Sequence, residues 1–487
     1  MSDGRWRSIL HPAGCRTVNL RRSQITSGHM IIELVMQNGK TGNTVVLVRL
    51  RAVFSRVRKG KRLSDNEQEN SRVQLPIASR KPCHKRHSAQ IRVWFNEDSP
   101  LAHSHPMRIG FTSMQREANV GTTRYYTDER TFWHCTGVQS LFIPIGDWME
   151  PPSGSYGADT PASKRRIINL IRASGLDAHL DVRSAEPAER EDLLRVHPAS
   201  YLDAFKALSD ENGGELGTFA PFSKGAFEIA LLSSGLAIAA LESVLTGEAP
   251  NAYALCRPAG HHCLADESMG FCLLANIPIA IEAMKARHGV GKVAVVDWDV
   301  HHGNGTQSIF YERGDVLTIS IHQDRCFPPG YSGFEDRGAG AGEGCNLNVP
   351  LPAGSGHACY MDAMERIVVP ALEAYEPELI VVASGLDANG VDPLARQLLH
   401  SDTYRAMTQL MMRTAEKLCG GKLAMVHEGG YAEAYVPFCG QAIVEALAGV
   451  NAIVEDPELE FFEAQQPGDK ALRFQKDWVN EMVETLG

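Results

Sequence analysis

The most constraining feature of this sequence is a helical segment followed directly by a short apolar run, a pairing that occurs three times. The pairs are IPIAIEAMKARHG with KVAVVDWD, VVPALEAYEP with ELIVVASGLD, and MMRTAEKLCGG with KLAMVHEGGY. Short apolar runs separated by helices are typical of strands that are buried on both faces of a parallel sheet. The pattern therefore predicts an α/β fold with a mainly parallel sheet and helices on both faces.

Polar residues suited to catalysis follow each of the three apolar runs. They lie within 297–302, 384–387 and 427–431. In open α/β sheets ligands bind beyond the carboxyl ends of the strands, so we expect these three segments to converge on one crevice.

The first of these segments, VDWDVHHGNGTQ, contains a candidate metal site. Residues two apart in an extended chain point to the same side, so Asp299 and His301 can approach one metal ion together. Asp297 shares this parity but lies deeper along the strand, which favours a supporting or alkali-ion role. Asp387 supplies a third ligand, since a catalytic zinc usually has three protein ligands and one open position. Two carboxylates and one imidazole suit either Zn²⁺ or Fe²⁺.

Two further motifs offer groups for acid–base catalysis. RPAGHHCLADESMGFC places His261 and His262 in a turn after a strand, where one can act as a general base and the other as a charged partner. EGGY places Tyr431 after two glycines, and a phenol there can donate a hydrogen bond to a carbonyl that gains negative charge. Alone, such histidines are more often loop residues and GGY is more often a turn, so these roles depend on the metal motif.

The first 113 residues differ in charge from the rest of the chain. They contain 20 lysines and arginines against 7 acidic residues, whereas the remaining chain contains 28 against 51. A basic arm can bind nucleic acid by releasing counterions, but no zinc-finger, helix-turn-helix or RNA-binding signature occurs here. We expect an extension without a fold of its own, or an untranslated upstream reading frame with the true start at Met114.

The remaining chain is expected to divide into a catalytic domain over 114–455 and a helical tail over 456–487. The tail is amphipathic and is expected to pack on the core or on a neighbouring subunit of a homo-oligomer. The chain has no run of about 18 uncharged apolar residues and no apolar secretory segment at its start, so we expect a cytoplasmic protein without a membrane partner. Its 11 cysteines form no CxxC pair, and they are expected to be reduced, buried thiols.

Seven motifs, in order, resemble the histone deacetylase superfamily, which includes acetylpolyamine amidohydrolases and shares its three-layer fold with the arginases. They are RPAGHH, MGFC, VDWDVHHGNGTQ, LTISIHQ, NLNVPLP, SGLDANGVDP and HEGGY. CFPPGYSG and NLNVPLPAGSG are most similar to the bacterial class II-like histone deacetylase-like amidohydrolases. The resemblance extends from Tyr125 to Gly449, and it implies zinc-dependent hydrolysis of N-acetyl amides, above all acetyl-lysine side chains of proteins or peptides, with release of acetate.

The resemblance also implies roles for individual residues. The zinc ligands would be Asp299, His301 and Asp387. The catalytic groups would be His262 as general base and acid, His261 as its electrostatic partner, Asp297 as the partner of His261, and Tyr431 as the group that polarises the acetyl carbonyl. The acyl-lysine channel would be lined by Gly270, Phe271 and Phe327. A structural potassium ion would be held by Asp297, Asp299, His301, Ser320 and Ile321, and a second by the backbone near Phe310, Arg313 and Val316.

Two positions depart from the patterns of related enzymes. Asn304 stands where many members of the superfamily have an aspartate, so His262 would have a neutral partner and a less raised pKa. Asn389 stands where arginase-like enzymes have a second metal-binding carboxylate, which favours a single metal ion.

Two alternative functions stay open. An acetylpolyamine amidohydrolase would use the same chemistry, although its long insertion has no obvious counterpart between Ser209 and Phe222. A non-catalytic acyl-lysine binder would be expected to lack Tyr431 or a metal ligand, and all of these residues are present.

Overall fold

The computed structural model describes residues 29–38, 44–53, 72–74, 121–137, 139–140, 143–144, 157–330 and 333–486. The chain divides into two compact units, Met1–Arg116 and Glu117–Gly487. The first unit contains an antiparallel sheet of β1 (His29–Asn38), β2 (Thr44–Val53) and β3 (Arg72–Gln74). Most of residues 1–113 lie outside the described residues, so the expectation for this extension stays a prediction.

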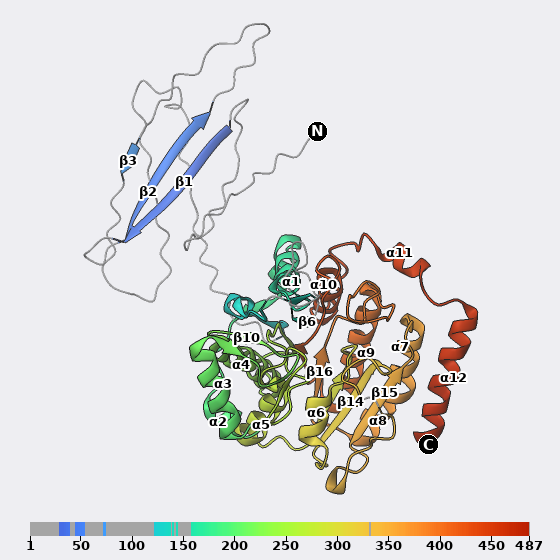
Figure 1. Cartoon of the computed structure of the whole chain (residues 1–487). Helices are drawn as coiled ribbons and strands as arrows, with labels where there is room; N and C mark the ends of the chain where they lie inside the picture. Colours follow the sequence, from blue (N-terminus) through green and yellow to red (C-terminus); the bar gives the residue numbers. More distant parts are fainter. Residues whose placement is uncertain are drawn as a thin grey trace. The chain divides into compact units, whose positions relative to one another are not determined.

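The second unit is built around an eight-stranded sheet in which every neighbouring pair is parallel (Figure 1). The strand order is β15-β14-β13-β16-β17-β11-β4-β7. In chain order the strands are β4 (Arg124–Tyr126), β7 (Asp181–Arg183), β11 (Asn251–Ala254), β13 (Val293–Asp297), β14 (Val316–Gln323), β15 (Asn346–Leu351), β16 (Leu379–Ser384) and β17 (Leu423–His427). The three strands predicted from the helix-and-strand pairs lie together at the centre as β13, β16 and β17.

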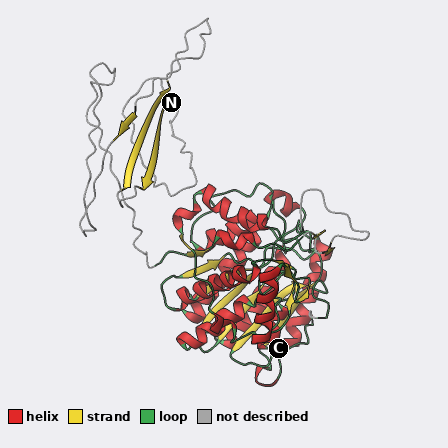
Figure 2. Ribbon diagram, turned by 60° about the vertical axis from the view of Figure 1, so that its left-hand side comes forward, coloured by secondary structure: helices red, strands yellow, loops and turns green. Residues whose placement is uncertain are grey.

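Helices cover both faces of this sheet (Figure 2). Their bounds are α1 (Pro161–Ser174), α2 (Arg190–Leu193), α3 (Ala199–Glu211), α4 (Ala226–Leu245), α5 (Asn276–His288), α6 (Asn304–Phe310), α7 (His357–Ala363), α8 (Val369–Tyr375), α9 (Ser401–Cys419), α10 (Val436–Leu447), α11 (Leu459–Ala464) and α12 (Asp469–Leu486). The predicted α/β fold is confirmed.

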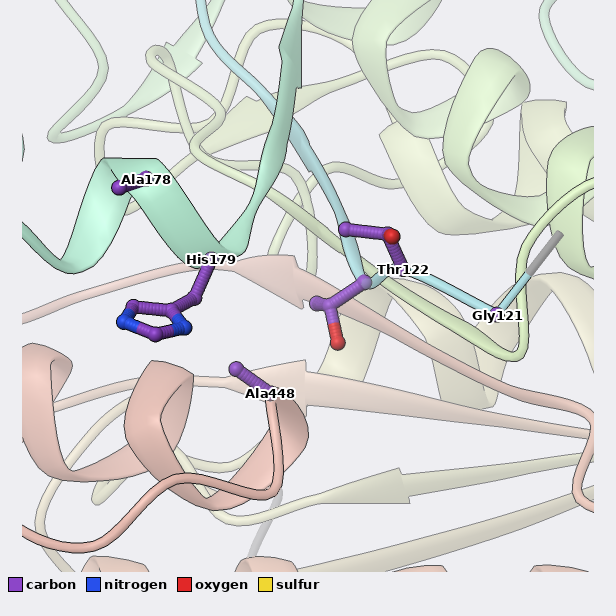
Figure 3. Close-up of a pocket in the computed structure, with 6 residues that line it drawn as sticks. Gly121, Thr122, Ala178, His179 and Ala448 are labelled. Atoms are coloured by element: carbon purple, nitrogen blue, oxygen red, sulfur yellow. The ribbon is translucent and has the colours of Figure 1, made fainter. Parts of the chain in front are cut away.

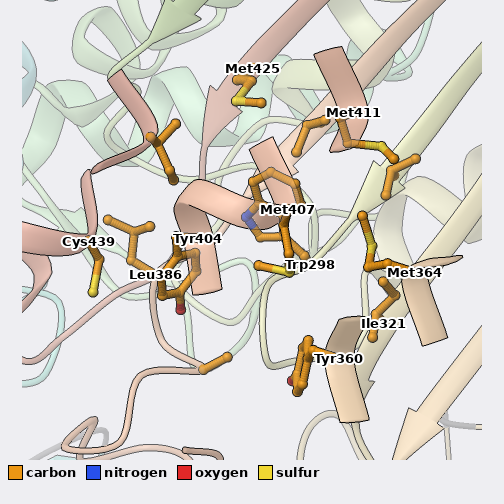
Figure 4. Close-up of a cluster of buried hydrophobic side chains, with 14 of the residues drawn as sticks. Trp298, Ile321, Tyr360, Met364, Leu386, Tyr404, Met407, Met411, Met425 and Cys439 are labelled. Carbon is orange, nitrogen blue, oxygen red and sulfur yellow. The ribbon is translucent and has the colours of Figure 1, made fainter. Parts of the chain in front are cut away.

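Alternate residues of one strand fill two separate apolar cores, as the pleat of a strand requires. Ala294 and Val296 of β13 belong to a cluster with residues of α1, α9 and α10, whereas Val293 and Val295 belong to a cluster with α4 and α5. Figure 4 shows part of the first cluster around Trp298, which is fully buried. The two cores fix β13 on both sides and thereby fix the residues that follow it.

Helix α4 is long and apolar enough to cross a membrane by length and composition, and 67% of its apolar stretch is buried inside the structure. Its residues form much of the second core, including Leu236, Ala237 and Leu241. This burial accounts for its apolar character within the part of the chain that the structure describes.

Two helical parts of the chain are interrupted, one before α3 and one in the tail. The segment EDLLRVHPASYLDAFKAL is not continuous, because α2 ends at Leu193 and α3 begins after Pro198, whose backbone is extended. A proline disfavours helical backbone in the residue before it, which explains the break. The tail forms α11 and α12, and α12 packs on the core: the indole of Trp478 donates to the carbonyl of Pro350 over 2.8 Å.

Candidate metal centre and active site

Three side chains converge beyond the carboxyl ends of β13 and β16. Nδ1 of His301 lies 3.2 Å from Oδ1 of Asp299 and 3.2 Å from Oδ2 of Asp387. One donor atom of each residue lies within 4.8 Å of the others, and all three residues are buried. Two carboxylates and one imidazole nitrogen in a buried cluster form a donor set that fits a single zinc ion.

Backbone hydrogen bonds bring these ligands together. Strand β13 ends at Asp297, so the alternation of a strand does not extend to the ligands. Instead, Oδ1 of Asp297 accepts from the backbone N–H of Asp299, and Oδ1 of Asp299 accepts from that of His301, each over 3.0 Å. Asp387 binds the same turn, since its Oδ1 accepts from Val300 N over 2.9 Å. The three ligands therefore converge as expected. Turns capped by carboxylates bring them together, and not the alternation of side chains along a strand.

The first histidine of the pair is tied to a carboxylate. Nδ1 of His261 donates to Oδ2 of Asp297 over 2.9 Å, and its Nε2 lies 3.8 Å from Oδ1 of Asp299. Burial opposes charge on His261, but Asp299 and Asp297 outweigh it and raise its pKa to about 10. Burial also raises the pKa of Asp297, to about 6. At neutral pH the proton therefore lies on His261, whose charged imidazolium is paired with an ionised Asp297.

The second histidine of the pair, His262, is neutral, whereas His261 is charged. Burial, followed by the charges of His261 and His301, lowers the pKa of His262 well below its usual value. Nδ1 of His262 lies 2.7 Å from Oδ1 of Asn304, whose amide nitrogen faces the sulfur of Met269. An amide oxygen only accepts, so Nδ1 carries the hydrogen and Nε2 has a free lone pair. The geometry gives His262 the tautomer of a general base.

Tyr431 is held by the loop after β17. Its backbone N–H donates to Oδ2 of Asp392 over 2.8 Å, and the preceding Gly429 N–H donates to Oδ2 of Asp299 over 2.8 Å. Burial, together with Asp387 and Asp299, raises the pKa of Tyr431 well above its usual value. The phenol therefore keeps its proton and can donate it in a hydrogen bond.

These groups open on a cavity of about 220 Å³. Its lining consists of Phe219, His262, Gly270, Phe271, His301, Cys326, Phe327, Leu394 and Tyr431. Phe327 contacts His262 edge-on with ring centroids 5.0 Å apart, and Phe271 contacts Tyr431 with centroids 5.8 Å apart. Gly270 has φ of +54°, and a Cβ there would lie 2.4 Å from Cδ2 of His262. The structure thus brings the three predicted channel residues to the catalytic groups.

Several residues at this site were missed by sequence reasoning. Phe219 joins the cavity because β9 (Gly217–Thr218) pairs with β12 (Ser268–Met269), a long-range contact with no local signal. Glu428 is fully buried, and its Oε2 accepts from the backbone N–H groups of Gly260 and His261 over 2.7 and 3.1 Å. Asp392 lies in the SGLDANGVDP motif and Glu428 in the HEGGY motif, so the sequence signal for both residues is their place in these motifs.

The proposed potassium ligands lie beside the candidate zinc ligands. Asp297 of β13 is directly opposite Ser320 of β14, and Ile321 is the next residue of that strand. Oγ of Ser320 lies 3.3 Å from Gly303 N, which donates to it. The potassium ion at this position, and the second one near Phe310, stay predictions.

A second hollow of about 300 Å³ lies at the amino ends of β4 and β7, on the opposite edge of the sheet (Figure 3). It is lined by Gly121, Thr122, Thr123, Ala178, His179 and Ala448. His179 is the one titratable side chain in this described lining, so the hollow offers no catalytic arrangement comparable to the cavity at the carboxyl edge.

Comparison with known proteins gives consistent results. Residues 158–447 match the histone deacetylase domain. A histone deacetylase-like amidohydrolase of Pseudomonas aeruginosa is 60% identical over 365 residues, which cover 75% of this chain and 96% of that protein. A probable deacetylase of Archaeoglobus fulgidus is 38% identical over 306 residues, which cover 61% of this chain and 84% of that protein. The crystal structure of the HDA15 HD domain superposes with a TM-score of 0.63 at 29% identity, covering 75% of this chain and 95% of that one.

Proposed function

Because the chain belongs to the histone deacetylase family, we propose that it is a zinc-dependent amidohydrolase that removes acetyl groups from lysine side chains of peptides or proteins. The observation that carries this proposal is the convergence of a buried cluster of candidate metal ligands, a neutral imidazole and a protonated phenol on one cavity. The products would be acetate and a free amine.

The zinc ion would be held by Asp299, His301 and Asp387. When bound, it would supply Lewis acidity, which polarises the amide carbonyl and makes a water molecule easier to deprotonate. The fit rests on the donor set, which is buried and contains two carboxylates that need a compensating cation.

The protein groups would move the protons. His262, neutral and with Nε2 unprotonated, would take the proton of the attacking water and later deliver it to the departing amine. The charged His261–Asp297 pair would stabilise negative charge in the transition state. Tyr431 would donate a hydrogen bond to the carbonyl oxygen as it becomes an oxyanion.

The cavity lining supports an acyl-lysine substrate over a polyamine. None of its nine described residues has a carboxylate side chain, and three are phenylalanines. A lysine side chain presents four methylene groups to such walls, whereas a polyamine carries additional cations that need acidic partners.

The test is acetate release by the zinc-loaded protein from acetyl-lysine peptides and from N-acetylputrescine. We expect a higher kcat/KM for the peptides, loss of activity with a chelator and recovery with zinc. A higher kcat/KM for N-acetylputrescine would favour the polyamine alternative. Absence of acetate from every substrate, with zinc bound, would refute the enzymatic proposal.

A further inference from the structure

Helix α1 carries a buried lysine that lies outside the acid–base machinery. Lys164 is 2% exposed, and its ammonium forms an ion pair with Oδ1 of Asp159 at 3.0 Å. Asp159 also pairs with Arg257, which is 1% exposed, at 3.2 Å. Two buried cations therefore share one carboxylate, an arrangement that is costly unless the additional positive charge has another partner.

Neither His134 nor Arg257, the other groups next to Asp159, supplies a second negative charge for the two cations. Burial and the charge of Arg257 lower the pKa of His134 to about 3, so His134 is neutral. Arg257 directs its other donors to the backbone carbonyls of His134 and Asp159, over 2.6 and 2.9 Å. Asp159 thus remains paired through Arg257 even without Lys164.

The ammonium of Lys164 turns instead toward the loop that carries the phenol. Its Nζ lies 3.4 Å from the carbonyl oxygen of Gly430, to which it donates, and 5.0 Å from the centroid of the Tyr431 ring. An ammonium has three donors, and this distance is within the range of a cation–π contact. The loop is therefore held at three consecutive residues: Gly429 by Asp299, Gly430 by Lys164 and Tyr431 by Asp392.

We propose that Lys164 is a positioning residue that holds Tyr431 in place for hydrogen bonding to the substrate carbonyl, through the Gly430 carbonyl and the ring face. The cation also favours the partial negative charge that a phenol oxygen gains as it donates. Lys164 itself does not line the cavity. This inference rests on the proposed deacetylase activity.

The test compares Lys164→Met, Tyr431→Phe and the double variant on an acetyl-lysine peptide and on its trifluoroacetyl analogue. Methionine conserves the unbranched apolar part of the side chain and removes the ammonium, and Arg257 continues to neutralise Asp159. We expect Lys164→Met to lower kcat roughly tenfold on the acetyl peptide, with KM and zinc content unchanged. The loss should be smaller on the trifluoroacetyl peptide, whose activated carbonyl needs less polarisation, and Lys164→Met should cause no further loss in the Tyr431→Phe background.

A matched control is Lys285→Met on α5, because Lys285 is also largely buried and ion-paired, at 2.9 Å from Asp315, but lies at the amino end of β13. It should leave kcat on both substrates unchanged. If Lys164→Met does not fold, Lys164→Gln takes its place with the same expectations. An unchanged kcat, or an equal loss in both Tyr431 backgrounds, would refute the positioning role. An inactive wild-type protein would instead refute the proposed function.

Discussion

Replacing Asn304 with aspartate should move the acidic limb of the pH–rate profile to higher pH. Asn304 is fully buried, and its Oδ1 accepts the hydrogen of His262 Nδ1 over 2.7 Å. The substitution would conserve the shape of the side chain but place a negative charge beside the imidazole. His262 is active as a base only when neutral, so activity falls as pH decreases through its pKa. A carboxylate favours the charged imidazolium and therefore raises that pKa.

The size of the shift follows from the geometry. Charges centred about 4 Å apart interact by about 4 kcal/mol at an effective dielectric constant of about 20, which corresponds to about three pKa units as an upper bound. Burial opposes both charges. The second oxygen of the new carboxylate would face the sulfur of Met269, which now accepts a hydrogen bond from the Asn304 amide and has no hydrogen to donate to a carboxylate. We expect a net rise of about one to two units.

The assay is kcat/KM against pH for the wild type, Asn304→Asp and Asn304→Ala, because kcat/KM reports the pKa values of the free enzyme. Zinc content measured at each pH separates the titration of His262 from loss of metal. Asn304→Ala removes the hydrogen-bond acceptor of His262 without adding charge, so the acidic limb of its pH–rate profile should not move to higher pH. An acidic limb that stays in place or moves to lower pH in Asn304→Asp, with zinc still bound, would show that His262 is not the base.

Three further predictions concern the metal, the phenol and the extension. Asp387→Ala should release zinc and abolish activity, as measured by metal analysis and acetate release; full zinc occupancy with normal turnover would exclude Asp387 as a ligand. Tyr431→Phe should lower kcat by about 10²–10³ with zinc retained, and an unchanged rate on an acetyl-lysine peptide would remove Tyr431 from the mechanism. Residues 114–487 expressed alone should match the full chain in melting temperature, zinc content and rate, and loss of solubility or activity on truncation would contradict that expectation.

The central part of the fold could be predicted because its signals are local. Each of β13, β16 and β17 is a short apolar run between a helix and a polar segment, and parallel strands bring such segments to one edge of the sheet. The break between α2 and α3 depends on Pro198 and does not follow from apolar periodicity.

Site residues could be predicted from the sequence where their side-chain chemistry identifies them. Residues that reach the site only through tertiary packing could not. Asp299, His301 and Asp387 stand out because carboxylate and imidazole groups are metal ligands. Lys164 is not recognisable as a contact of Tyr431, because 266 positions separate it from Gly430 and its helix looks ordinary in sequence. Phe219 likewise reaches the cavity only through the pairing of β9 with β12.

The packing of α12 on β15 has a consequence for the solubility of the protein. β15 is an edge strand of the sheet, and an exposed edge offers unpaired backbone groups to a second chain. Pro350 within β15 lacks a backbone N–H, and its carbonyl accepts from the indole of Trp478 on α12. The C-terminal helix therefore covers part of an edge that would otherwise favour aggregation, and a chain shortened before Asp469 should expose this part of β15 to strand addition although every catalytic group is intact.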